Sequence, residues 1–180
     1  MGSRYKEHNP SEVACMKELL SHDPRLRNRS KEYKRSILES ADRGEYRVEA
    51  AFENAIAQVG KLIPNPDSIG PDYLHGQGDA KWISLGYCQT VTKKKLSEGV
   101  NPYYSYQTQI TNIHRKYGPL RIGVYHPKYD EVEYFLVKEK IWKSWVNKSG
   151  GIVIKYNKRT GCLGRLEEYK VSFKELCQKV

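Results

Sequence analysis

Two aspartates and a lysine lie close together in this sequence, at Asp72, Asp79 and Lys81, with Gly76 and Gly78 between the two acids. Carboxylate oxygens are the ligands that hard cations such as Mg²⁺ prefer. Two carboxylates on one patch of a folded protein also repel each other unless positive charge lies nearby. These residue types therefore predict a metal site if the fold brings the two acids together.

The local elements are expected to bring them together. Residues 79–85 are mostly apolar or aromatic and show no helical repeat, which predicts a strand with Asp79 and Lys81 on one face. A two-residue turn at Gly76-Gln77 would make this strand part of a hairpin and would pair Asp72 with Lys81. Directly opposed residues share a face, so all three charged side chains are expected on one patch.

The pairing of Pro71-Asp72 with Asp79-Ala80-Lys81 resembles the motif of the PD-(D/E)xK nuclease superfamily, which includes the type II restriction endonucleases. The spacing between the two aspartates is on the short side for that superfamily. The resemblance implies a magnesium-dependent endonuclease that hydrolyses phosphodiester bonds of double-stranded DNA, at specific sites. It implies that Asp72, Asp79 and the main-chain carbonyl of Ala80 hold the metal, and that Lys81 orients the attacking water or helps to deprotonate it.

A helix is predicted over residues 45–60, because an apolar stripe at helical spacing runs along it: Val48, Phe52, Ala55, Ile56 and Val59. Glu49 and Glu53 lie one turn apart at the edge of this stripe. In the nuclease superfamily a glutamate that follows an aromatic residue on such a helix reaches the metal, which favours Glu53 and keeps Glu49 in reserve. The alternative for both is an ordinary solvated glutamate.

The chain has 180 residues and 38% hydrophobic residues, enough for one domain with a substantial core. Its net charge is +10, and a basic domain of this kind favours a polyanionic partner, most commonly nucleic acid. Because it has no apolar run of membrane-spanning length and no signal-peptide pattern, we expect a cytoplasmic protein without membrane contact.

The four cysteines are scattered without a CxxC pair, and they are Cys15, Cys88, Cys162 and Cys177. They are typical of reduced thiols and not of a disulfide framework. A zinc site is an open alternative without support from the spacing, and its ligands would be Cys88, His114, His126 and Cys162.

Further elements follow in order along the chain. Helices are predicted at residues 10–21, 30–41, 103–117 and 138–146, strands at 120–125 and 132–137, a hairpin of 151–156 with 163–169, and a last helix opened by the capping box at Ser172. This order predicts an α/β fold with a mixed central β-sheet flanked by helices, as in the restriction endonuclease-like core. We expect a single nuclease domain: an N-terminal helical extension at 1–44, a catalytic core at 45–146, and a C-terminal hairpin and helix at 147–180.

Candidate DNA contacts lie in two places. Some members of the superfamily carry DNA-contacting glutamines on a helix that follows the motif, which makes Gln107 and Gln109 candidates. The predicted tail hairpin carries Lys155, Lys158 and Arg159 around a tight turn, a geometry that could follow a groove or a row of phosphates. Packing residues and a solvated turn are the alternatives for these two groups.

Three other functions compete with a homodimeric restriction endonuclease. One is a non-enzymatic, basic nucleic-acid-binding module in which the acidic hairpin is incidental. Another is a homing or repair nuclease of the same fold. A small-molecule enzyme is disfavoured, because the chain has no phosphate-cradling glycine loop.

Overall fold

The computed structural model describes residues 17, 19, 29–42, 48–67, 69–84, 89–90, 104–110, 113, 116–126, 131–157 and 160–180. Within these residues, helices come first, a run of strands follows, and helices and strands alternate towards the end of the chain. The helices are α2 (Lys31–Asp42), α3 (Val48–Gly60), α5 (Glu139–Ser144), the 3₁₀ helix η4 (Gly164–Tyr169) and α6 (Phe173–Cys177). The strands are β1 (Asp79–Ser84), β2 (Gln89–Thr90), β3 (Tyr104–Ile110), β4 (Leu120–His126), β5 (Glu131–Val137), β6 (Ile152–Asn157) and β7 (Lys170–Val171).

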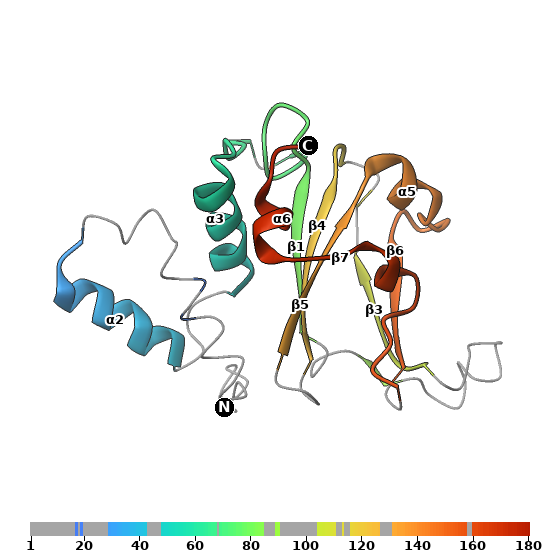
Figure 1. Cartoon of the computed structure of the whole chain (residues 1–180), viewed down its shortest axis with the longest axis horizontal. Coiled ribbons are helices and arrows are strands. Elements are labelled where there is room, and N and C mark those ends of the chain that lie inside the picture. Colours follow the sequence, from blue (N-terminus) through green and yellow to red (C-terminus); the bar gives the residue numbers. More distant parts are fainter. Residues whose placement is uncertain are drawn as a thin grey trace.

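A four-stranded mixed sheet carries the motif strand β1 at its edge, in the order β1-β4-β5-β7 (Figure 1). β1 and β4 are parallel, with Asp79 opposite Leu120, and the remaining pairs are antiparallel. A parallel pair needs a crossover connection. Here that connection includes β2 and β3, which belong to a second sheet of order β2-β3-β6.

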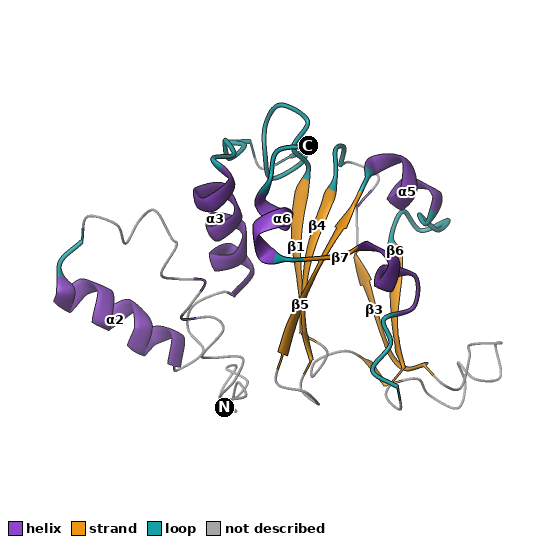
Figure 2. Ribbon diagram, in the orientation of Figure 1, coloured by secondary structure: helices purple, strands orange, loops and turns teal. Residues whose placement is uncertain are grey.

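Helices α3 and α6 cover one face of the four-stranded sheet (Figure 2). The ring of Phe52 on α3 meets Trp82 of β1 edge to face, at 5.4 Å between centroids. Gly123 of β4 is paired with Trp82, and a Cβ there would lie 2.8 Å from the indole and 3.1 Å from Phe52. The missing side chain therefore lets α3 pack closely on the sheet, which places its acidic residues beside β1.

The opposite face of this sheet packs on the second sheet, together with α5 and η4. Ile122, Val124 and Phe135 are fully buried there, in one apolar cluster with Ile154 of β6. Trp142 of α5 is also buried in this cluster, and its indole nitrogen donates to the carbonyl of Gly118 at 2.8 Å. None of the described helices is long and apolar enough to cross a membrane.

Most of the predicted elements are confirmed. The helices expected at 30–41 and 138–146 and the strands at 79–85, 120–125 and 132–137 correspond to α2, α5, β1, β4 and β5. The capping box is also present: the Ser172 hydroxyl accepts from the amide of Glu175, whose carboxylate accepts from the amide of Ser172. Of the helix expected at 10–21 the structure describes residues 17 and 19, which are helical.

Two predicted elements are wrong. The helix at 103–117 is instead the strand β3, which pairs with β6. Tyrosine, threonine and isoleucine in this stretch suit a strand as well as a helix, and the pairing with β6 decides between them. The tail hairpin is also wrong, because residues 164–169 form the 3₁₀ helix η4 and β6 pairs with β3 instead. On α3, Val59 is 41% exposed and does not extend the buried stripe.

Candidate active site

The chain turns at His75-Gly76, where both φ angles are positive, at 57° and 72°. The amide of Tyr73 donates to the Gly78 carbonyl at 3.0 Å, and a further bond from Gln77 to Leu74 closes the turn. These signs of φ are those of a type I′ turn, and histidine tolerates the left-handed region better than most residues. The predicted turn at Gly76-Gln77 is therefore wrong by one residue, and Asp72 lies opposite Asp79 and not opposite Lys81.

Arg121 holds this hairpin in place from the neighbouring strand β4. Its fully buried guanidinium donates to the carbonyl and the side-chain oxygen of Gln77, at 3.1 and 3.2 Å. It also donates to the carbonyls of Leu176 and Gln178 at the end of α6. Buried charge is tolerated when hydrogen bonds surround it. Nothing in the sequence identified Arg121, because its partners are main-chain groups and an amide far away along the chain.

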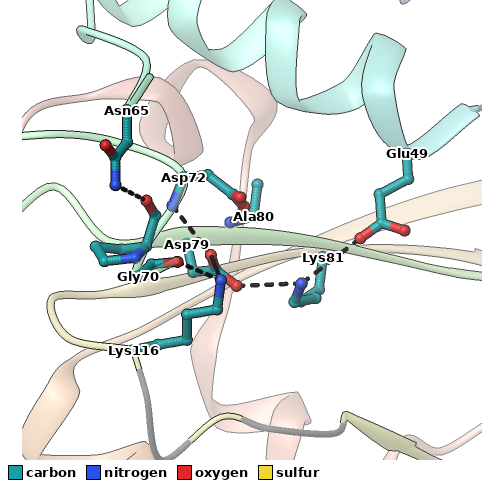
Figure 3. Close-up of polar contacts among 9 residues, drawn as sticks. Glu49, Asn65, Gly70, Asp72, Asp79, Ala80, Lys81 and Lys116 are labelled. Carbon is teal, nitrogen blue, oxygen red and sulfur yellow. Dashed lines mark hydrogen bonds and ion pairs between the residues drawn. The ribbon is translucent and has the colours of Figure 1, made fainter. Parts of the chain in front are cut away.

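The two aspartate carboxylates accept backbone hydrogen bonds across the hairpin (Figure 3). The amide of Asp72 donates to Asp79 Oδ1 at 3.1 Å, and the amide of Ala80 donates to Asp72 Oδ2 at 2.9 Å. Asp79 is 1% exposed, whereas Asp72 is half-buried. The sequence prediction that these carboxylates converge is confirmed, with a different hairpin register from the one expected.

Two lysines flank the Asp79 carboxylate, one at each oxygen. Lys81 Nζ lies 3.3 Å from Asp79 Oδ2 and 3.6 Å from Glu49 Oε1. Lys116 Nζ lies 3.3 Å from Asp79 Oδ1 and also donates to the carbonyl of Gly70. Lys81 was predicted at this patch. Lys116 was missed, since it reaches the site through the parallel pairing of β1 with β4, which the sequence does not reveal.

Helix α3 supplies two more carboxylates. Glu49 forms the ion pair with Lys81. Glu53 lies one turn further on, and its backbone carbonyl accepts a hydrogen bond from the Tyr73 hydroxyl at 2.7 Å. Burial, followed by the charges of Asp72 and Glu49, raises the pKa of Glu53 to about 7. Glu53 therefore lies within electrostatic reach of the aspartate pair, whereas Glu49 lies beside Lys81.

When all groups of the site are ionised, its carboxylates outnumber the two lysine ammoniums, so the net charge of the site is negative. Burial and then the charge of Asp79 raise the pKa of Asp72 to about 7. Burial lowers the pKa of Lys81, but the carboxylates of Asp79, Glu49 and Asp72 more than offset this, so its pKa lies above the ordinary value. Lys81 is consequently a protonated ammonium at neutral pH.

A cavity of about 180 Å³ opens beside the aspartate pair. Asp72, Glu53, Lys116, Asn65 and Asp67 contribute to its wall. The Asn65 side chain is held by the carbonyl of Pro71 at 2.9 Å, directly before the first aspartate. The cavity gives a small polar group access to Asp72.

A divalent cation fits the chemistry of this donor set. Asp79 Oδ2 is buried and has no hydrogen-bond partner among the described residues, although the Lys81 ammonium lies near it. Burial and the neighbouring carboxylates raise the pKa of Asp72 and of Glu53, and a cation nearby would offset the repulsion between these carboxylates. Within the described ranges, no three His, Cys, Asp or Glu side chains lie close enough together to hold a metal ion by themselves. The fit therefore rests on the aspartate pair.

Three of the five predicted DNA contacts lie on the second sheet, namely Gln107, Gln109 and Lys155. Gln107 and Gln109 are on the strand β3, not on a helix, and pair with Lys155 and Val153 of β6. Lys155 is exposed. Lys158 and Arg159 lie outside the described residues.

The four ligands of the alternative zinc site are largely outside the described part of the chain. Cys88, His114 and the side chain of His126 are not described, and Cys162 is a free thiol.

Comparison with known proteins adds no relative: no family model, curated protein or solved structure matches this chain.

Proposed function

We propose that the protein is a magnesium-dependent endonuclease that hydrolyses phosphodiester bonds of double-stranded DNA. The observation that carries this proposal is the convergence of Asp72 and Asp79 at the edge of a mixed sheet, with Lys81 3.3 Å from the buried carboxylate. This is the juxtaposition that the PD-(D/E)xK resemblance implied. The turn at His75-Gly76 brings Asp72 and Asp79 together from the two arms of the hairpin.

The three residues of the motif and one main-chain carbonyl have roles in this proposal. Asp72 and Asp79 would hold the metal, with the Ala80 carbonyl as the further ligand that the resemblance implies. Bound Mg²⁺ supplies Lewis acidity, which polarises the phosphate and makes a water more acidic. Lys81, beside the Asp79 carboxylate, would orient the water and offset charge on phosphorus. A water oxygen then bonds to phosphorus while its proton passes to a neighbouring solvent water, the P–O bond to the leaving oxygen breaks, and that oxygen takes up a proton from solvent.

Charge supports DNA as the partner. The chain has a net charge of +10, and such a balance favours a polyanion through phosphate contacts. We extend the proposal to site-specific cleavage by a homodimer, as in restriction endonucleases, because the scissile bonds of the two strands are related by a two-fold axis.

A non-enzymatic binding module is the competing function, and one observation favours it. Two lysine ammoniums already neutralise Asp79 in this structure. If no cation displaces either of them, the acidic hairpin is a structural element and the basic surface alone is functional.

Cleavage of mixed duplex DNA by the wild type and by Asp79→Asn tests the proposal. We expect magnesium-dependent cleavage by the wild type, with products mapped at single-base resolution. Asp79→Asn should lose cleavage while its DNA affinity holds or rises, because a negative charge near phosphate is removed.

Glu168→Gln is a suitable control, because it removes one exposed acid from η4 and leaves the hairpin intact. It should cleave like the wild type. Equal cleavage by Asp79→Asn and wild type at saturating Mg²⁺ would refute the assignment of the site. Duplex binding by a wild type that cleaves none of the substrates would favour the binding module.

A further inference from the structure

Lys116 is a second lysine of the site that the motif does not contain. Its ammonium lies 3.3 Å from Asp79 Oδ1 and donates to the carbonyl of Gly70. The side chain is 17% exposed and forms part of the cavity wall beside Asp72 and Glu53. Lys116 therefore contacts the more buried aspartate from the side on which the cavity opens.

The backbone that carries Lys116 is fixed to the hairpin. The amide of Asp79 donates to the carbonyl of Pro119 at 3.0 Å. Gly118 touches the hairpin so closely that a Cβ there would lie 2.6 Å from the carbonyl of Gly76. The amide of Lys116 donates to the carbonyl of Ile113 at 2.9 Å. Because these two hydrogen bonds and this close contact hold the backbone, the flexible four-carbon stem is the part of Lys116 that can move.

The position of the ammonium conflicts with a metal ligated by both aspartates. Asp79 Oδ1 already accepts the Asp72 amide and pairs with Lys116, and a cation held between Asp72 and Asp79 would lie close to this ammonium. Like charges a few ångströms apart in a partly buried site repel strongly. Lys116 and the metal therefore compete for the same carboxylate.

We propose that Lys116 is a tethered cation: it neutralises Asp79 in the metal-free protein, and it is exchanged for the divalent cation when the site is loaded. Lys116 thereby sets the metal affinity of the site and keeps the acidic hairpin folded without metal. This inference rests on the proposed function, because it takes Asp72 and Asp79 as the metal ligands. Lys81 differs from Lys116 in that Glu49 holds it on the side of α3.

Calorimetric titration of the purified chain with MgCl₂ tests the exchange without any need for cleavage. Lys116→Met removes the charge and keeps the length of the side chain, and we expect its dissociation constant for Mg²⁺ to fall about tenfold relative to wild type. Lys116→Gln is a second neutral variant that retains a donor for the Gly70 carbonyl, and it should show the same change. Lys116→Arg keeps the charge and should bind Mg²⁺ like the wild type.

Two controls separate this inference from the proposed function. Lys140→Met removes one exposed lysine from α5, and its dissociation constant should equal that of the wild type. Asp79→Asn should abolish binding in any background. Thermal unfolding gives a second readout: Lys116→Met and Lys116→Gln should melt below wild type without metal and recover most of the difference in MgCl₂.

The outcomes are distinct. Wild-type binding that Asp79→Asn abolishes, together with unchanged or weaker binding by both neutral Lys116 variants, would refute the exchange and leave the metal site standing. A wild type and neutral variants that all fail to bind Mg²⁺ would overturn the metal site and the exchange together. Should Lys116→Met not fold, the comparison of Lys116→Gln with Lys116→Arg decides the question by the same criterion.

Discussion

Asp79 is the central residue of the site, because its two oxygens contact Asp72, Lys81 and Lys116. Oδ1 accepts the Asp72 amide and pairs with Lys116, whereas Oδ2 is buried beside Lys81 without a hydrogen bond. Burying a carboxylate is unfavourable unless positive charge accompanies it. At the scale of single residues, Lys81 and Lys116 therefore stabilise the buried carboxylate of Asp79.

Substitution of Lys81 distinguishes a nuclease from a binding module. Lys81→Ala preserves the strand and removes the ammonium 3.3 Å from Asp79, so turnover should fall by orders of magnitude while duplex binding persists. Lys81→Arg keeps the charge but replaces a compact ammonium by a wide planar fork, and it should also be largely inactive. Single-turnover cleavage and a binding titration on the same duplex measure both effects. Full activity of Lys81→Arg would contradict a positioning role for the ammonium.

The stability of the metal-free protein should depend on pH through Asp72 and Glu53. Folding raises their pKa from 3.8 and 4.5 to about 7, so the folded state binds protons more tightly than the unfolded state. Such groups stabilise the fold fully below their unfolded pKa, and this stabilisation is lost as pH rises through the folded value. We expect the Tm to fall across the window from about pH 4 to pH 7, measured by thermal denaturation without metal.

Asp72→Asn combined with Glu53→Gln provides the control for this titration. Neither replacement side chain ionises, so the Tm difference between variant and wild type should grow through the same window. Parallel pH profiles of variant and wild type would show that these acids do not titrate with raised pKa values.

The β-hairpin is the element that sets the distance between the two aspartates. Its turn at His75-Gly76 places Asp72 opposite Asp79, and its second strand begins β1 at the sheet edge. Arg121 and the loop before β4 hold it from two sides. The geometry of the site is therefore a property of the hairpin together with β4.

Gly78→Ala should disrupt this element far more than Gly76→Ala. Both glycines have positive φ, at 86° and 72°, so an alanine is strained by about 1–2 kcal/mol at either position. A Cβ on Gly78 would additionally lie 1.8 Å from the carbonyl oxygen of Pro119, whereas a Cβ on Gly76 meets nothing within 4 Å. Denaturant unfolding should show a modest loss of stability for Gly76→Ala and a loss several times larger for Gly78→Ala. Equal losses would mean that the contact with Pro119 does not constrain the hairpin.

At the scale of the whole molecule, a small acidic site lies within a chain that is basic as a whole. The four-stranded sheet holds the acidic site at its edge, between α3 and the loop before β4. The chain as a whole is nevertheless basic, at +10. The proposed nuclease requires both properties, carboxylates to hold a cation and a positive balance to bind a polyanion.

Salt dependence of duplex binding tests the role of this charge. If lysines and arginines contact phosphates, log K should fall linearly with log salt, by about 0.9 for each contacted phosphate. Fluorescence anisotropy across a salt series, in Ca²⁺ or without metal to prevent cleavage, gives the slope. A nearly flat response would show that the basic balance does not serve DNA binding.

The sequence by itself determined the elements whose patterns are local. The buried stripe of Phe52, Ala55 and Ile56 on α3, the alternation of β1 and the capping box at Ser172 depend on neighbours a few residues away, and all three are present. It also determined that Asp72, Asp79 and Lys81 meet, because a short hairpin and the alternation of a strand suffice for that. Even a turn misplaced by one residue left the two acids within contact.

Tertiary structure decided what depends on partners far away along the chain. The stretch around Gln107 could have formed either a helix or a strand, and its pairing with β6 made it β3. Lys116 reaches Asp79, and Arg121 reaches Gln77, because β4 lies parallel to β1 after a long crossover. Local sequence carries no information on which strand becomes the neighbour of β1. The long-range pairing of strands, and the burial that follows from it, therefore fixed the second lysine of the site and the support of its hairpin.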